Sequence, residues 1–371
     1  MRYTLAARNL EPRAIAGVFS LDLKSDEPAV HALAELLGVP ARFFTPARLA
    51  EESPRLANPS DIVLRETGCP GVAEGAALAA AGPQGRLLVE KTRSARATCA
   101  IAESPAPLLD LPGRARGRLS VVGIGPGSRE WLSPAAATAL SAATDWVGYD
   151  LYLDLVSHLS AGKTEHRFPL GAEETRVRTA LALAGEGRNV ALVSSGDAGI
   201  YAMGSLACEL LDRGDLDPAA RRTALDVVPG ISAFQAAAAR AGALIGHDFC
   251  CISLSDLLTP GEVIETRLRA AADADLVTAL YNPRSARRTD QLAKAIAIFA
   301  ARRPPGTPVV VASNLGRPDE RTRVVPLADF DPAEIDMLTI VLIGSSASRA
   351  FTRGDGTTIA YTPRGYAGKT P

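Results

Sequence analysis

Four short stretches of this 371-residue sequence combine residue types that could hold a ligand or carry out chemistry. They are GIGPG at 123–127, SSGDAGIYAMG at 194–204, PGISA at 229–233 and YNPRSARR at 281–288. Glycine lets a backbone approach a ligand closely, and Ser, Asp and Asn side chains supply hydrogen bonds. The first stretch invites comparison with a phosphate-binding loop of the dinucleotide type. However, Gly123, Gly125 and Gly127 do not fit the G-x-G-x-x-G spacing, and Pro126 has no backbone N–H to donate to a phosphate.

Each of these stretches comes directly after residues typical of a buried strand. The four strands are predicted at 119–122, 190–194, 225–228 and 276–281, with three more at 250–254, 308–312 and 337–343. Alanine-rich helical stretches separate them, an alternation that favours a largely parallel sheet. Open α/β sheets bind ligands beyond the carboxyl ends of their strands, so we expect the four stretches to meet at a ligand site. Taken singly, each could equally be a turn or a helix cap.

The composition of the chain divides it into domains. Residues 104–117, SPAPLLDLPGRARG, are rich in Pro and Gly and predict a linker between a small α/β domain at 1–103 and a larger domain at 118–350. The larger domain is expected to form two subdomains, at about 118–229 and 230–350, and residues 351–371 an irregular tail. Within the small domain we predict helices and strands at the following positions: strands at 14–21, 61–64, 87–90 and 98–102, and helices at 27–37 and 72–81.

Charge and cysteine content argue against several classes of protein. The net charge is −1, so no basic field indicates binding to nucleic acid or to an anionic membrane. The five cysteines lack zinc-binding spacing, and we expect no metal. With no signal peptide and no apolar run of about 18 residues or more, the sequence predicts a cytoplasmic protein.

Considered together, the motifs resemble one family. GIGPGSREWLS, SSGDAGIYAMG, the stretch from VPGISA to LSDLLTP, YNPRSARR and DMLTIVLIGSS are similar to the tetrapyrrole (corrin/porphyrin) methyltransferases, over roughly residues 118–350. Within that family, GYDLYLDLV at 148–156, LSDLLTP at 254–260 and LYNPRSARR at 280–288 resemble the precorrin-3B carbon-17 methyltransferase branch. The resemblance implies two α/β subdomains with S-adenosylmethionine in the cleft between them, usually in a homodimer. It also implies methylation of precorrin-3B at carbon 17 with ring contraction to precorrin-4, in aerobic cobalamin (vitamin B12) biosynthesis.

The same resemblance implies the residues of the site. The expected cofactor contacts are Gly125, Pro126, Ser195, Gly196, Asp197, Ile200, Tyr201, Met203, Ser232, Ala233 and Asn282. Ring contraction needs proton transfers, for which the candidates are Tyr149, Asp150, Asp248 and Asp256, with Tyr152 and His247 beside them. Carboxylate side chains of the substrate would meet the cluster of Arg284, Arg287 and Arg288, with Arg129 and Arg317 as further cations. Each candidate has a structural alternative as a cap, a wall residue or a solvated charge.

Residues 14–102 carry a second resemblance, to the small cobalamin-biosynthesis domain shared by the CobE and CbiG proteins. FSLDLKSDEPAVHALAELLGVP and NPSDIVLRETGCPGVAEGAALAAAG carry it, together with LLVEKTRSARATCAIA. The glycine-rich strand and helix that usually precede LDLKSDE are not recognisable, so we expect a domain truncated at its start. Lys24, Glu27, Glu74 and Lys91 match recurrent positions, to which we assign no role. A scaffold or a partner that hands over substrate is as consistent with this domain as catalysis.

Three alternatives stay open beside this prediction. The same methylation could take place on a cobalt-containing intermediate, as in the anaerobic route. The chain could instead be a tetrapyrrole-binding carrier that has lost activity. A dinucleotide-binding oxidoreductase is the least favoured, because of Pro126 and the glycine spacing.

Overall fold

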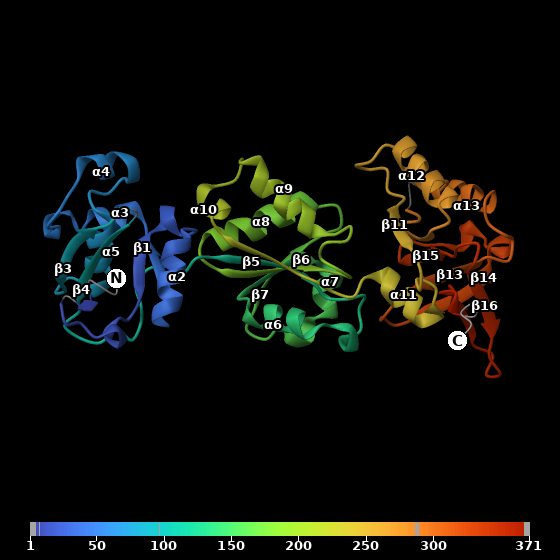
Figure 1. Ribbon diagram of the computed structural model, residues 1–371, viewed down its shortest axis with the longest axis horizontal. Coiled ribbons are helices and arrows are strands. Elements are labelled where there is room, and N and C mark those ends of the chain that lie inside the picture. The colour runs from blue at the N-terminus through green and yellow to red at the C-terminus, as the bar shows by residue number, and fades with distance from the viewer. Residues whose placement is uncertain (1–4, 7, 96, 286–288, 367–371) are drawn as a thin grey trace.

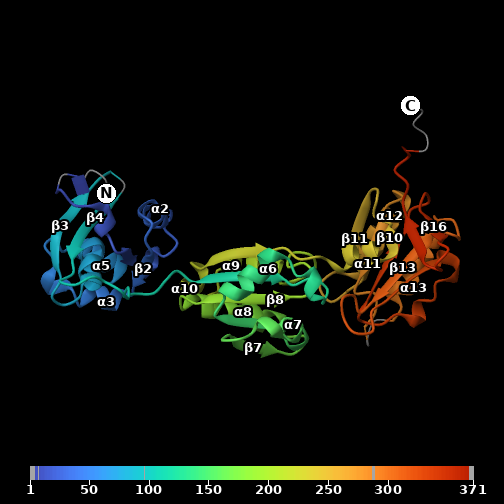
Figure 2. The ribbon, with the colours of Figure 1, turned by 90° about the horizontal axis from the view of Figure 1, so that it is seen from below.

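The computed structural model describes residues 5–6, 8–95, 97–285 and 289–366. The chain forms three α/β units that follow one another along its longest axis (Figure 1), and they stay in a row in the view turned by 90° (Figure 2). Among the residues described, no helix is long and apolar enough to cross a membrane.

The N-terminal unit, blue in Figure 1, contains two separate pairs of strands. β1 (Val18–Leu21) runs parallel to β2 (Ala41–Phe44), and β3 (Arg86–Arg93) runs antiparallel to β4 (Thr98–Glu103). Helix α5 (Val72–Ala81) contacts β1, β3 and β4, and its alanines bring the backbone of the helix close to the strands. In the described part of this unit, further α-helices are α2 (Pro28–Leu37), α3 (Pro46–Ala50) and α4 (Asp61–Thr67).

One predicted strand of this unit is a helix. Residues 61–64 open α4, because the Ser60 hydroxyl accepts a hydrogen bond from Val63 N (3.5 Å) and Gly68 ends the helix with a φ of 77°. The apolar run that indicated a strand does not enter the core, since Ile62 is 65% exposed. The prediction was therefore wrong here, because the Ser and Gly capping signals outweigh the β propensity of two residues.

The linker attaches the N-terminal unit to the central one. Phe43 and Arg114 exchange two backbone hydrogen bonds, of 2.8 and 2.9 Å. The Arg114 guanidinium pairs with Asp22 (3.0 Å) and also donates to the carbonyl of Gly185 (3.2 Å), the last residue of α8. The next strand of the chain begins at Arg118, so the linker reaches the central sheet at the amino ends of its strands.

The central unit, green in Figure 1, is built on a five-stranded sheet with order β7-β6-β8-β5-β9, and every pair in it is parallel. Helices α8, α9 and α10 cover one face, while α6 and α7 cover the other. The predicted strands at 119–122, 190–194 and 225–228 are confirmed. The elements are β5 (Arg118–Gly123), α6 (Pro134–Ala142), β6 (Asp145–Tyr149), α7 (Asp150–Leu155), β7 (Thr164–Phe168), α8 (Glu173–Gly185), β8 (Asn189–Ser194), α9 (Met203–Arg213), α10 (Pro218–Arg221) and β9 (Ala224–Val228).

The third unit, yellow to red in Figure 1, holds a sheet of order β11-β12-β15-β13-β14. Only β11 and β12 are parallel, so the expectation of a largely parallel sheet is wrong here. The cause is a hairpin of β13 and β14, followed by the return of β15 between β12 and β13. The elements are α11 (Ala233–Ala241), β11 (Phe249–Ser253), α12 (Gly261–Asp273), β12 (Val277–Tyr281), α13 (Gln291–Ala300), β13 (Pro308–Ser313), β14 (Arg321–Pro326) and β15 (Thr339–Ile343).

Residues 349–361 are more ordered than the sequence predicts. β16 (Arg349–Thr352) and β17 (Thr358–Tyr361) form a hairpin, and β17 pairs in parallel with β10 (Gly242–Ala243). Ala360 is completely buried with the core around α11. The polar, glycine-containing turn of this hairpin gives the irregular appearance that we interpreted as a tail.

Candidate functional site

Three of the four stretches meet at the carboxyl edge of the central sheet, because β8, β5 and β9 are neighbours. Gly125 and Gly196 exchange backbone hydrogen bonds of 3.1 and 2.8 Å, which joins the first stretch to the second. A Cβ on Gly123 would lie 2.7 Å from Gly196 O and 2.8 Å from Gly230 N. The loops can approach this closely only because these positions are glycines.

Asp197 holds two of these loops together. Its carboxylate accepts hydrogen bonds from Gly199 N (2.8 Å) and from Gly230 N (3.0 Å). The first bond shapes the loop that contains Asp197, and the second joins that loop to PGISA. In this structure the Asp197 carboxylate therefore holds the second loop against PGISA, while its expected contact with a cofactor stays a prediction.

Arg317 reaches this edge from the third unit, directly after β13. Its Nε donates to the carbonyl of Pro126 (2.9 Å), and a terminal nitrogen donates to the Ser195 hydroxyl (3.1 Å). A Cβ on Gly127 would lie 2.6 Å from Arg317 Cγ, so this glycine makes room for the arginine. Burial lowers the pKa of Arg317, although the nearby Tyr152 acts in the opposite direction. The sequence pointed to Arg317 only as one further cation.

Two tyrosines follow β6 at the same edge. Tyr149 ends the strand and Tyr152 lies in α7, and their rings meet edge to face with centroids 5.1 Å apart. Burial raises the pKa of Tyr152, although Arg317 lowers it. Asp150 lies apart from them, because its half-exposed carboxylate is 3.9 Å from the guanidinium of Arg167 in a surface group of charges.

A second set of contacts joins the central and third units. Tyr201 has a φ of 51°, and its hydroxyl donates to Cys251 O (2.9 Å), while its ring centroid lies 5.0 Å from that of Tyr281. The Tyr281 hydroxyl shares a hydrogen bond with the Ser232 hydroxyl and accepts one from Phe234 N (3.3 Å). Burial raises the pKa of Tyr281 to about 12, so its hydroxyl stays protonated at neutral pH.

The remaining expected cofactor contacts lie around these bridges. Ser232 is 2% exposed and caps α11 together with Gln235, and Ala233 is the first residue of that helix. Ile200 packs against the core of the third unit. Met203 begins α9.

The carboxyl ends of β11 and β12 carry the expected residues of the third unit. Asn282 adopts a φ of 49°, and its amide donates to the Ser253 hydroxyl (3.0 Å). Asp256 accepts a hydrogen bond from Gln291 (2.9 Å). Arg284 donates to Ala333 O (2.8 Å), whereas Arg287 and Arg288 lie outside the described residues.

Asp248 and His247 are not brought to this edge. They come immediately before β11, at its amino end, and the His247 Nδ1 lies 3.5 Å from a carboxylate oxygen of Asp248. At about 3.3 Å per residue, the five residues of β11 separate them from Ser253 and Asn282 by roughly 13 Å or more. Both side chains are more than half exposed.

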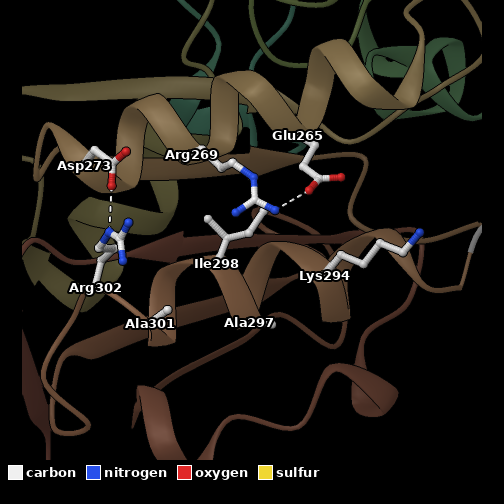
Figure 3. Close-up of a pocket in the computed structure, with 8 residues that line it drawn as sticks. All are labelled: Glu265, Arg269, Asp273, Lys294, Ala297, Ile298, Ala301 and Arg302. Carbon is white, nitrogen blue, oxygen red and sulfur yellow. Dashed lines mark hydrogen bonds and ion pairs between the residues drawn. The ribbon is translucent and has the colours of Figure 1, made fainter.

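Two cavities lie away from these loops. A groove of about 350 Å³ runs between α12 and α13 (Figure 3), where Arg269 pairs with Glu265 and Arg302 pairs with Asp273 (2.7 Å). Its lining includes none of the predicted site residues.

The second cavity, of about 1180 Å³, lies in the N-terminal unit and includes Lys24, Glu27 and Lys91 in its lining. Glu74, the fourth recurrent position, is 1% exposed and accepts backbone hydrogen bonds from Asn58 (2.9 Å) and Lys91 (2.8 Å). Burial raises the pKa of Glu74, but these hydrogen bonds outweigh it, so the net pKa is lowered. Its carboxylate thus supports the loops of this unit.

The fold defines an α/β protein whose strand-end loops converge at the carboxyl edge of the central sheet, where Arg317 of the third unit contacts them. The chain belongs to the tetrapyrrole (corrin/porphyrin) methylases, whose family model matches residues 118–331, and the predicted membership is confirmed. A second family model, the C-terminus of the cobalamin synthesis protein G, matches residues 1–102. In the described residues, no group of three or more His, Cys, Asp or Glu side chains is arranged to hold a metal ion.

Relatives and one solved structure cover the same region. The chain is 44% identical over 252 residues to the precorrin-3B C(17)-methyltransferase of a Sinorhizobium species, which covers 68% of this chain and 98% of that protein. It is 44% identical over 248 residues to a probable cobalt-factor III C(17)-methyltransferase of Salmonella typhimurium, covering 67% and 99%. The crystal structure of the methyltransferase CobJ matches with a TM-score of 0.61 and 41% identity, over 67% of this chain and 100% of that chain. Other curated relatives with 44% identity are longer, and this chain spans about half (51%) of their length.

Proposed function

We propose that this chain is an S-adenosylmethionine-dependent methyltransferase that methylates precorrin-3B at carbon 17. The methylation is coupled to ring contraction to precorrin-4, in aerobic cobalamin biosynthesis. The observation that carries the proposal is the arrangement of three strand-end loops, joined through Gly125 and Gly196 and closed from the third unit by Arg317. These loops lie within the region that is similar to a precorrin-3B methyltransferase over 98% of its length.

The glycine loops fit the proposed cofactor. A Cβ on Gly125 would lie 2.8 Å from Trp131 O, so the loop has room for backbone atoms but not for a side chain at this position. The buried Ser194 hydroxyl has no hydrogen-bond partner among the described residues, and a polar ligand at this edge would satisfy it. When bound, S-adenosylmethionine supplies an electrophilic methyl group. The residues proposed to hold it are Gly125, Pro126, Ser195, Gly196, Asp197, Ile200, Tyr201, Met203, Ser232, Ala233 and Asn282.

The chain contributes mainly position and exclusion of water. Arg317 fixes the Pro126 carbonyl, and Tyr201 joins the central unit to the third through Cys251 O and the ring of Tyr281. Rigid loops of this kind keep two reactants aligned, which supplies much of the rate increase in a transfer that needs no covalent help from the protein.

Ring contraction needs groups that move protons. We propose Tyr149 and Tyr152 as proton donors, because both lie at the carboxyl edge and burial raises the pKa of Tyr152, which keeps its hydroxyl protonated. Asp256 is the proposed carboxylate on the side of the third unit, and Arg284 a proposed contact for substrate carboxylates. Asp150 and Asp248 are not part of the proposal, because the first lies in a surface group of charges and the second at the opposite end of β11.

The test of substrate is a parallel assay. The purified protein receives S-adenosylmethionine with either metal-free precorrin-3B or the cobalt-containing intermediate, and methylation is followed by mass spectrometry. We expect turnover of the metal-free substrate. Turnover of the cobalt form alone would overturn this choice. The proposed substrate would then be the cobalt-containing intermediate, in line with the similarity to the cobalt-factor III methyltransferase.

Ligand binding tests the alternative that the chain is a tetrapyrrole-binding carrier without methyltransferase activity. Calorimetry with S-adenosylhomocysteine should give one site per chain. If the intact protein bound the tetrapyrrole but not S-adenosylhomocysteine, the carrier would replace the methyltransferase.

We also propose a cytoplasmic homodimer. The resemblance to the family supports the dimer, and five free cysteines support a reducing compartment. Light scattering during gel filtration should give twice the chain mass of 38.7 kDa, and a monomer mass would contradict the dimer.

A further inference from the structure

Arg176, on the first turns of α8, is a buried cation that none of the roles above uses. Its residue is 3% exposed. One terminal nitrogen donates to Pro169 O (3.1 Å), and the other lies 3.9 Å from the Met203 sulfur. The Nε is buried and has no hydrogen-bond partner among the described residues. Within the same residues Arg176 forms no ion pair with a carboxylate.

A buried guanidinium with an unbonded N–H group and no ion pair costs free energy unless another group binds it. A guanidinium carries five N–H donors and is always charged. Burying that charge without a partner costs far more than burying a neutral group. In folded proteins, buried charges are therefore paired or bind a ligand of opposite charge.

The topology places Arg176 at the ligand edge of the central sheet. Pro169 follows β7, Tyr152 follows β6 and Met203 begins the helix after the β8 loop, and these three strands are neighbours. Arg176 contacts the first and the last of these segments. Figure 1 shows this end of the sheet facing the third unit.

A second arginine, the partly buried Arg317, borders the same place. Arg317 bonds only a carbonyl and a hydroxyl, and it forms no ion pair in the described part of the chain. Burial raises the pKa of Tyr152, and the positive charges of both Arg317 and Arg176 lower it, so both cations lie near this ring. The carboxylate of Glu173 acts on this pKa in the opposite direction, and it accepts a hydrogen bond from Gly171 N (3.2 Å). Arg317 and Arg176 thus bring two positive charges to the surroundings of Tyr152.

We propose that Arg176 is a carboxylate-binding residue of this site, and that Arg317 adds to the positive field around it. A carboxylate has the geometry and the charge to satisfy the free Nε and an adjacent terminal nitrogen together. The source of the carboxylate rests on the proposed function, which offers two. They are the amino-acid end of the cofactor and an acid side chain of the tetrapyrrole.

The test uses Arg176→Gln and Arg176→Lys, with Arg178→Gln as the matched control. Arg178 lies on the same helix, but it is on the surface and paired with Glu174 and Asp215. Calorimetry compares S-adenosylhomocysteine with 5′-methylthioadenosine, which lacks the carboxylate. Methylation assays give the KM for the tetrapyrrole, and thermal unfolding is recorded with and without glutarate as a simple carboxylate.

We expect Arg176→Gln to weaken binding of one carboxylate ligand by about 10-fold to 100-fold, the usual effect of losing a charge-assisted pair. Weaker S-adenosylhomocysteine with unchanged 5′-methylthioadenosine assigns the cofactor carboxylate. Unchanged S-adenosylhomocysteine with a raised KM assigns the tetrapyrrole. Arg176→Lys keeps the charge but not the fork, so it should show a smaller loss, and it serves as the test if the Gln variant does not fold.

Two outcomes distinguish failure of the Arg176 proposal from failure of the proposed function. If a folded Arg176→Gln or Arg176→Lys protein binds both ligands and turns over as the wild type does, Arg176 is structural and the proposal is wrong. If the wild type neither binds S-adenosylhomocysteine nor methylates, the proposed function fails. Stabilisation of the wild type but not of Arg176→Gln by glutarate would then still support the carboxylate site.

Discussion

Replacing Gly230 by alanine should open the loops of the site. Its added Cβ would lie 2.2 Å from Gly196 O and 2.6 Å from Gly123 O, all backbone atoms of the other two loops. Ordinary contact begins at 3.4 Å, so the loops must separate by about 1 Å, an overpacking that typically costs about 1–3 kcal/mol. Gly230 does not have a positive φ, so the backbone conformation itself tolerates alanine and only the missing space opposes it.

The effect on activity should exceed the effect on stability. A displacement of about 1 Å in a positioning element costs about 100-fold in rate. We therefore expect kcat/KM for methyl transfer to fall by about that factor, while Tm falls by only several degrees. Gly306→Ala is the control, because a Cβ there meets nothing within 4 Å and the residue also lacks a positive φ. If Gly230→Ala kept both kcat/KM within about twofold and the Tm of the wild type, the proposed tight convergence of the loops would be refuted.

Three further substitutions test single contacts. Tyr281→Phe removes the hydroxyl that bonds the buried Ser232 hydroxyl and accepts from Phe234 N, and the free energy of unfolding in urea should fall by about 1–3 kcal/mol; an unchanged value would contradict a stabilising role for these bonds. Asp197→Asn keeps one carbonyl acceptor for two backbone donors, so binding of S-adenosylhomocysteine should weaken by about 10-fold, and equal affinity would show that the link to Gly230 is dispensable. Burial alone would raise the pKa of Asp145, but hydrogen bonds from three neighbours lower it below the ordinary 3.8. This carboxylate thus stabilises the fold above that value and loses the contribution as pH falls, and unfolding curves of Asp145→Asn should depend less on pH in that range than those of the wild type.

The sequence predicted the strand-end loops well because their signals are local. A buried strand followed by glycines can be recognised within about ten residues, and 119–122, 190–194 and 225–228 are indeed strands. Local signals also mislead where caps compete with propensity, as they do at Ser60 and Gly68.

Contacts between distant segments were not predictable in the same way. Arg317 binds Pro126 across 191 residues of chain, and nothing in SNLGRPDE states where that side chain will end. The antiparallel return of β15 likewise depends on strand pairing over long distances, which alternation of strands and helices does not specify. A useful signal was present, since Arg317 follows a predicted strand by only a few residues.

The attachment of the N-terminal unit has a consequence for the traffic of small molecules. Arg114 fixes that unit at the amino ends of the central strands, and the glycine loops lie at the carboxyl ends. The six residues of β5 put about 17 Å of packed sheet between the two ends. A compound leaving the N-terminal cavity must therefore diffuse around the central unit through water to reach the loops of its own chain. Delivery to a neighbouring molecule is then as direct a route as delivery within one chain, and any advantage of the fusion would lie in local concentration and not in a tunnel.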